Sequence, residues 1–262
     1  MTRHVSGACR ILCFALLSAL SPGVFAKGKI ETPAPLDPIQ AEREARTLVA
    51  ELLTQRPEEN ATNIGRLIVQ PNRTSQSELR VRFETVRTAT NWLSIYETLP
   101  AERQAKPTRL VVVHTSGQPN QYLLDEPGSP AAGPRQLAGN QTMIPFAGSD
   151  FWVADLGFEF LSWPKQTLLK KEMKNNKFCE VLESTNPKPE SGGYARVVTW
   201  ITADKPHAPA RADAYDASGK KIKAFDPKTV EKVEGAYQVH SVEMRNLKTR
   251  SRTVMEFNSD AD

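Results

Sequence analysis

The hydrophobic and polar positions follow a helical period in one early segment. Asp37 is suited to capping a helix, Pro38 follows at the first helical position, and Gln40 lies three residues after the cap. The apolar side chains that follow share one face at helical spacing: Ala41, Ala45, Leu48, Val49, Leu52 and Leu53. The pattern predicts one amphipathic helix that ends near Arg56-Pro57, because a residue before proline disfavours the helical conformation.

After this segment the period changes to two, which is typical of half-buried strands. In LRVRFE, the apolar Leu79, Val81 and Phe83 alternate with charged residues. Similar segments follow, separated by polar or proline-rich turns: NWLSIYE, RLVVVH, QYLLD, TLLKKEM, FCEVLES, YARVVTWIT, ARADAYD, KIKAF, TVEKVEG, YQVHSVEM and RTVMEF. Strands at such short intervals predict a mainly β protein with a few helices, arranged as an antiparallel meander and not as a βαβ fold.

Several predicted strands are apolar on both faces. Leu110 and Val112 alternate with Val111 and Val113, and Val197 and Ile201 alternate with Val198 and Trp200. A sheet with one face in water would show a cleaner alternation. We therefore expect both faces to be covered, by helices, by a second sheet or partly by a ligand.

The N-terminus has the pattern of a secretory signal peptide. A basic start is followed by the apolar run ILCFALLSAL, which is too short to span a bilayer, and then by SPGVFA with small or neutral residues at Val24 and Ala26. We expect cleavage after Ala26, so that residues 1–26 are the signal, 27–36 a leader and 37–262 a single domain. An uncleaved anchor helix is the alternative, and the Pro22-Gly23 break disfavours it.

Cleavage at this position changes the cysteine and charge counts. It removes Cys9 and Cys13, so the remaining Cys179 has no partner for an internal disulfide. It also removes Arg3 and Arg10, which lowers the formal net charge from +4 to +2. A chain so close to neutral gives no general reason to expect a nucleic-acid partner.

Motifs for catalysis, metals or cofactors are missing from the sequence. His114, His207 and His240 are scattered without metal-ligand spacing, and we interpret His114 and His240 as strand residues. Cys179 lies within a predicted strand and is interpreted as a small packing residue. No serine lies in a GxSxG motif, and no glycine-rich phosphate loop is present. The sequence therefore predicts neither an enzyme nor a bound cofactor or metal.

The segment GSDFWVADLGFEFLSW sets five aromatic rings beside three carboxylates, Asp150, Asp155 and Glu159. Asp150 could cap a short helix over Phe151–Leu156, and Gly157 could end it. Acid–base chemistry would need these carboxylates to converge on a further partner, and the sequence supplies none. We therefore expect the carboxylates to cap and solvate a helical segment that carries the rings.

Two segments resemble the LolA-like family of periplasmic outer-membrane lipoprotein-sorting proteins. The first is Arg135–Leu156, where RQLAGNQTMIPFA runs into GSDF and an aromatic, helix-prone stretch. The second is Tyr194–Phe257, with RVVTWI, the YDASGKKIKAF hairpin and VEMRNLKTRSRTVMEF in the family's order. The chain departs from the family pattern after GSDF, where Val153-Ala154-Asp155 stands in place of the usual Tyr-Glu-Asp.

The resemblance implies an open antiparallel half-barrel closed by the N-terminal helix and by short lid helices over an apolar cavity for acyl chains. The expected lid and cavity residues are Phe151, Trp152, Leu156, Phe158, Leu79, Val81, Phe83, Leu110, Val112 and Trp200. The alternative is that the rings of the GSDF segment fill an ordinary core, since aromatic clusters usually do so.

The implied function is a soluble periplasmic carrier. It would bind a lipid or the acyl chains of a lipoprotein and transfer them between an inner-membrane exporter and an outer-membrane acceptor. A second hypothesis is an exporter-associated adaptor without a ligand cavity, motivated by the altered GSDF segment and the short stretch after the last predicted strand. A third, a periplasmic hydrolase, has only Cys179 and the scattered histidines behind it.

Overall fold

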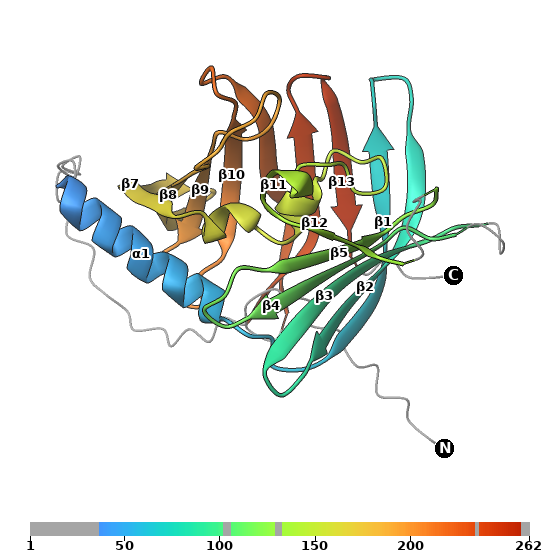
Figure 1. The fold of residues 1–262 in the computed structure, drawn as a ribbon, viewed down its shortest axis with the longest axis horizontal. Coiled ribbons are helices and arrows are strands. Elements are labelled where there is room, and N and C mark those ends of the chain that lie inside the picture. Colours follow the sequence, from blue (N-terminus) through green and yellow to red (C-terminus); the bar gives the residue numbers. More distant parts are fainter. Residues whose placement is uncertain (1–36, 102–105, 129–132, 234–235, 258–262) are drawn as a thin grey trace.

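The computed structural model describes residues 37–101, 106–128, 133–233 and 236–257. Its main element is one antiparallel sheet of 13 strands in the order β6-β5-β4-β3-β2-β1-β13-β12-β11-β10-β9-β8-β7. The predicted signal peptide and leader, residues 1–36, lie outside the described residues. Because β6 and β7 stand at opposite ends of the strand order, the sheet is open, as expected for a half-barrel (Figure 1).

The sheet consists of two meanders joined by the pairing of β1 with β13. The first meander contains β1 (Ala61–Gln70), β2 (Ser77–Arg87), β3 (Asn91–Leu99), β4 (Arg109–Thr115), β5 (Gln121–Asp125) and β6 (Arg135–Leu137). The second contains β7 (Lys165–Lys174), β8 (Lys177–Thr185), β9 (Arg196–Thr202), β10 (Pro209–Tyr215), β11 (Lys221–Val233), β12 (Ala236–Asn246) and β13 (Ser251–Glu256). The short helices η1 (Gly139–Thr142), α2 (Val153–Leu156) and η2 (Glu159–Ser162) lie in the connection between the two meanders.

The predicted N-terminal helix is confirmed as α1 (Pro38–Thr54). The carboxylate of Asp37 accepts hydrogen bonds from the backbone N–H groups of Ile39 and Gln40, as the cap pattern indicated. The helix ends slightly before the predicted Arg56-Pro57, because Gln55 is already extended. Five of the six predicted face residues are buried: Ala41, Ala45, Leu48, Val49 and Leu52.

Each segment predicted as a strand overlaps a strand of the sheet, with ends that differ by one or two residues in some cases and with three further differences. The segment KIKAF and the described part of TVEKVEG belong to the single strand β11, whose register shifts at Pro227 and Thr229. Strand β1 was missed because polar and glycine residues interrupt its apolar pattern, and β6 was missed because it has only three residues. A proline without an N–H group fits a bulge in a strand, which explains how one strand passes through Pro227.

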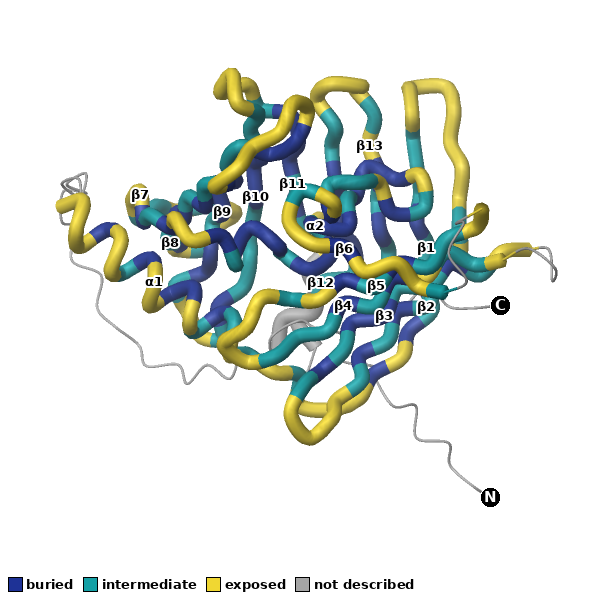
Figure 2. Tube along the Cα trace, in the orientation of Figure 1, coloured by how far each residue is buried: buried dark blue, intermediate teal, exposed yellow. Residues whose placement is uncertain are grey.

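The concave face of the sheet is covered by α1 over the second meander and by residues 139–163, here called the lid segment, nearer the first (Figure 1). One core cluster joins α1, η2 and strands β7–β11, and the other joins the first meander, the lid segment and β12–β13. Figure 2 shows this burial along the strands that face the lid segment. The concave face is thus covered by helices and the lid, as expected, whereas Val111, Val113 and Trp200 on the opposite face are only half-buried, so the expected cover of both faces is not seen there.

Among the described residues, no helix is long and apolar enough to cross a membrane.

Candidate ligand cavity

A cavity of about 200 Å³ lies between the concave face of the sheet and the lid segment. It is lined by residues from both meanders and from the lid: Phe83, Glu84, Thr85, Trp92, Ser94, Ile95, Tyr96, His114, Phe151, Asp155, Leu156, Phe158, Ala208, Pro209, Phe225, Pro227, Val239, Val242, Met255 and Phe257. Most of these side chains are apolar or aromatic. An apolar cavity of about 150 Å³ is large enough to bind benzene, so this cavity has room for an apolar ligand segment.

Aromatic rings form much of the cavity wall. The ring of Phe83 on β2 packs edge-on against Tyr96, with centroids 5.9 Å apart, and against Phe257, at 5.0 Å. The Tyr96 hydroxyl donates a hydrogen bond to the Leu156 carbonyl of the lid over 3.1 Å. The wall is therefore tied to the lid by a polar contact as well as by apolar packing.

Phe158 is a lid residue that packs against the core cluster containing α1. Its ring packs edge-on against Phe160 and Phe225, and it lines the cavity. Its φ of 50° lies in the left-handed region, which is uncommon for a bulky residue. This conformation costs free energy and persists only where the surrounding structure enforces it. Residues held in this way are found most often at functional sites, including ligand sites.

Three uncharged side chains form a polar patch on the mostly apolar wall: Thr85, Ser94 and His114. Ser94 Oγ lies 3.1 Å from His114 Nε2. The His114 ring stacks on Trp92 with centroids 3.5 Å apart and an interplanar angle of 11°. Burial lowers the pKa of His114 to about 4, and a hydrogen bond with Asn120 opposes this shift. The imidazole is therefore neutral at pH 7.

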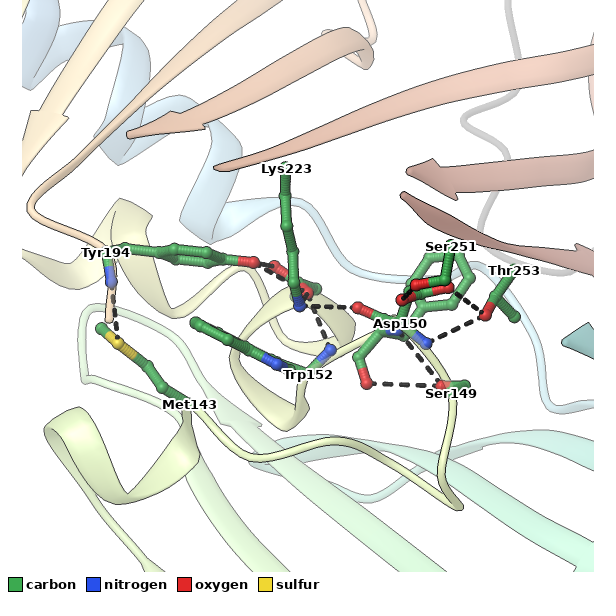
Figure 3. A network of polar contacts seen from close by, with 10 residues as sticks. Met143, Ser149, Asp150, Trp152, Tyr194, Lys223, Ser251 and Thr253 are labelled. Carbon is green, nitrogen blue, oxygen red and sulfur yellow. Dashed lines mark hydrogen bonds and ion pairs between the residues drawn. The ribbon is translucent and has the colours of Figure 1, made fainter. Parts of the chain in front are cut away.

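Asp150 anchors the lid segment to β13. Its carboxylate accepts hydrogen bonds from Ser251 Oγ at 2.6 Å and from Thr253 Oγ1 at 2.9 Å, and its backbone N–H donates to Thr253 Oγ1 (Figure 3). The prediction that Asp150 caps the short helix is wrong. Asp155 takes that role, accepting a hydrogen bond from the Trp152 N–H at 2.8 Å, while Gly157 ends α2 as predicted.

Lys223 on β11 is a buried cation beneath the lid segment. Its ammonium donates to the Asp150 carbonyl oxygen at 2.6 Å, lies 3.5 Å from Asp155 and sits 3.7 Å from the centroid of the Trp152 ring (Figure 3). Burial lowers the pKa of Lys223 to about 8, while Asp155 and Asp150 raise it. The Tyr194 hydroxyl also donates to Asp155, at 2.9 Å. These contacts give the carboxylate of Asp155 a structural role.

Four of the predicted lid and cavity residues line the cavity: Phe83, Phe151, Leu156 and Phe158. Three others, Val81, Leu110 and Val112, are fully buried in the core cluster on the same face of the sheet, and Leu79 packs against that cluster.

The two tryptophans of the predicted set lie outside the cavity wall. Trp152 stacks on Tyr194 with centroids 4.5 Å apart and packs against the core cluster that contains α1. Trp200 alternates with the buried Ile201 and therefore faces the opposite side of the sheet, where its indole N–H donates to Glu172.

Sequence reasoning missed the contribution of β3 to the cavity, and on β4 it named Leu110 and Val112 where His114 lines it. Trp92, Ser94 and Tyr96 alternate along β3 and all line it, which is a signal that NWLSIYE contains. His114 joins them because it lies opposite Trp92 in the β3–β4 pairing. Alternation with Leu110 and Val112 already puts His114 on this face of β4, whereas its place beside Ser94 depends on the pairing register, which only the tertiary structure shows.

The groups that motivated a hydrolase are poorly suited to catalysis. A His114 pKa of about 4 lies well below the range suited to a general base near neutral pH. Cys179 is fully buried, and burial raises the pKa of its thiol, which disfavours the reactive thiolate. Across the part of the chain that the structure describes, no group of three or more His, Cys, Asp or Glu side chains could hold a metal ion.

Three solved structures share this architecture. A domain assigned as an outer membrane lipoprotein-sorting protein from Vibrio parahaemolyticus matches with a TM-score of 0.63 and 17% identity, over 86% of this chain and 94% of that one. A DUF1329 family protein from Desulfovibrio piger matches with a TM-score of 0.61 and 17% identity, over 85% and 95% of the two chains. A LolA superfamily protein from Nitrosomonas europaea matches with a TM-score of 0.56 and 16% identity, over 82% of this chain and 91% of that one.

The fold is therefore that of the LolA-like lipoprotein-sorting proteins, as the sequence resemblance predicted. A family model described as "Uncharacterized protein" matches residues 106–260, more than half of the chain, and the chain belongs to this family. No curated protein matches its sequence.

Proposed function

We propose that this protein is a periplasmic carrier that binds a lipid, or the acyl chains of a lipoprotein, in the cavity beneath the lid segment. The observation that supports the proposal best is the apolar cavity itself, which lies between an aromatic wall and the lid. LolA-like folds are binding folds, and the Vibrio parahaemolyticus domain is assigned to lipoprotein sorting. The proposal includes residues 1–26 as an export signal that is cleaved after Ala26, and a single domain from residue 37 onward.

In this proposal Phe151, Leu156 and Phe158 contact the ligand from the lid, and Phe83 contacts it from the wall. Val81, Leu110 and Val112 pack beside that wall in the same core cluster. Burial of an acyl chain contributes about 0.8 kcal/mol for each methylene removed from water, before the costs of ordering the lid and ligand. A few buried methylenes therefore supply useful affinity and still permit release.

The carrier would receive its ligand from an inner-membrane exporter and deliver it to an outer-membrane acceptor. It would act without enzymatic turnover and without a cofactor, since the polar groups around the lid have structural contacts. The alternative, an adaptor that packs entirely against protein, would not need a cavity lined by so many apolar side chains. We therefore favour the carrier.

Ligand binding can be tested on the full-length chain after export and purification. Native mass spectrometry should find acyl species bound to the protein. After delipidation, the apolar dye diphenylhexatriene should bind and fluoresce. A protein that carries no acyl species and binds no dye would contradict the carrier and favour the adaptor.

A matched pair of variants tests whether the dye binds in this cavity. Val242→Phe adds a ring to the cavity lining and should weaken dye binding at least about tenfold, because the larger side chain fills space that the dye would occupy. Val254→Phe makes the same substitution on β13 between the buried Thr253 and Met255, so its side chain faces the other side of the sheet. This control should bind the dye as the unmodified protein does, and melting curves establish that both variants are folded.

A further inference from the structure

The polar patch is built by three neighbouring strands. Thr85 on β2 lies directly opposite Ser94 on β3, and His114 on β4 lies opposite Trp92, two residues from Ser94. Alternation along the strands therefore places Thr85, Ser94 and His114 on one face, and all three line the cavity. Thr85 is 5% exposed and Ser94 is 8% exposed.

Such polar groups are costly in an apolar cavity unless they have hydrogen-bond partners. Ser94 and His114 satisfy each other in part through their 3.1 Å contact. A serine hydroxyl can make one donor and two acceptor interactions, so this contact leaves Ser94 with hydrogen-bonding capacity. Because Ser94 lines the cavity, a ligand atom can use that capacity.

The charges around the cavity disfavour an anionic ligand. The ionisable acids that line it are Glu84 and Asp155, and no lysine or arginine lines it among the described residues. His114 is neutral at pH 7. The nearby Lys223 is held by the Asp150 carbonyl and by Asp155. A carboxylate entering the cavity would lose its hydration without meeting a cation, which is unfavourable.

We infer that the polar patch binds the uncharged oxygen-bearing group, an ester or a hydroxyl, of the lipid whose chain fills the cavity. The cavity would then prefer such lipids to free fatty acids of the same chain length. This inference rests on the proposed carrier function, and it assigns Ser94 as the main contact with His114 as the residue that positions the Ser94 hydroxyl.

The test measures displacement of diphenylhexatriene by methyl decanoate and by decanoate at pH 8, where the acid is ionised. The ester should displace the dye from the unmodified protein at a lower concentration than the acid. Ser94→Ala and His114→Phe should each weaken ester binding roughly five- to tenfold, the effect of one lost hydrogen bond. His114→Phe keeps a ring stacked on Trp92, so it removes the nitrogens with little loss of packing.

Two comparisons separate hydrogen bonding from hydrophobicity. Both variants should bind diphenylhexatriene, which has no polar group, at least as tightly as the unmodified protein, because each makes the cavity lining less polar. Thr115→Val removes a hydroxyl from the neighbouring position of β4, outside the cavity lining, and should leave both ester and dye binding unchanged.

The outcomes also separate this inference from the carrier proposal. If the dye and ester bind but Ser94→Ala binds the ester as tightly as the unmodified protein, or if decanoate binds more tightly than the ester, the inference fails and the carrier stands. If neither dye nor ester binds to the unmodified protein, both fail.

Discussion

At the scale of single residues, the aromatic side chains of the lid segment have different contacts. Phe158 lines the cavity, whereas Trp152 is enclosed by the Tyr194 ring and the Lys223 ammonium. The sequence places both rings in one aromatic segment and cannot distinguish these roles. Their side-chain directions follow from the left-handed conformation of Phe158 and from the cap of α2, which Asp155 provides.

The two rings should therefore respond differently to truncation. Trp152→Ala should lower the free energy of unfolding by about 2 kcal/mol or more, because it removes a packed ring and a partner of a buried cation. It should change dye affinity little. Phe158→Ala should weaken dye binding several-fold by removing part of the cavity lining. Melting curves and dye titrations on both variants check this, and weakened dye binding with an unchanged melting temperature in Trp152→Ala would contradict the assignment.

The buried carboxyl of Glu159 should make the stability of the fold depend on pH. Burial raises the pKa of its carboxyl from the usual 4.5 to about 7. Between these values the folded protein holds a proton that the unfolded chain has lost, so the contribution of Glu159 to stability falls as pH rises from about 4.5 to about 7. Glu159→Gln removes the titrating carboxyl, and with it this loss of stability. The variant should gain melting temperature relative to the unmodified protein across this interval, and an equal difference at pH 5 and pH 8 would disprove it.

At the scale of elements, the lid segment is held by polar contacts at defined points. Asp150 binds Ser251 and Thr253 on β13, and Lys223 on β11 holds the carbonyl of Asp150. These contacts connect the lid to the middle of the sheet.

Asp150→Ala should therefore loosen the lid. The change leaves the buried Thr253 hydroxyl without its carboxylate partner, which costs about 1–3 kcal/mol. Hydrogen exchange of the amides in residues 149–158 should become faster than in the unmodified protein. Asp216→Ala is the matched control, since that carboxylate caps the turn between β10 and β11 and does not contact the lid. Equal exchange in the lid of both variants would show that Asp150 is not the anchor.

At the scale of the whole molecule, ligand binding should stabilise the fold. The cavity is lined by both meanders and by the lid, so a bound chain contacts parts of the sheet that are distant in sequence. A ligand that binds only the folded protein at about 100 times its Kd adds about 2.7 kcal/mol to the free energy of unfolding. Methyl decanoate should therefore raise the melting temperature in a concentration-dependent manner, and much less so for Val242→Phe. An unchanged melting temperature at saturating ester would argue against binding to the folded state.

Much of the fold could be predicted from local sequence. The helical face of α1, its Asp37 cap and the alternation within most strands depend on neighbouring residues, and the structure confirms them. Strand β1 was not predicted, because Asn63 and Gly65 interrupt its apolar pattern. The alternation of Trp92, Ser94 and Tyr96 was also visible in the sequence, but only the structure shows that these three residues line a cavity.

The sequence by itself determined most of the extended segments, the buried face of α1 and the aromatic helical segment that interrupts the meander. Only the tertiary structure decided that β1 pairs with β13, that Asp150 binds β13 instead of capping a helix, and that His114 meets Ser94 at the cavity. The physical reason is the separation along the chain of the residues that each feature depends on. Periodicity and capping depend on residues a few positions apart, whereas a cavity and its polar patch depend on strand register and on contacts such as Asp150 to Thr253, which join distant parts of the chain.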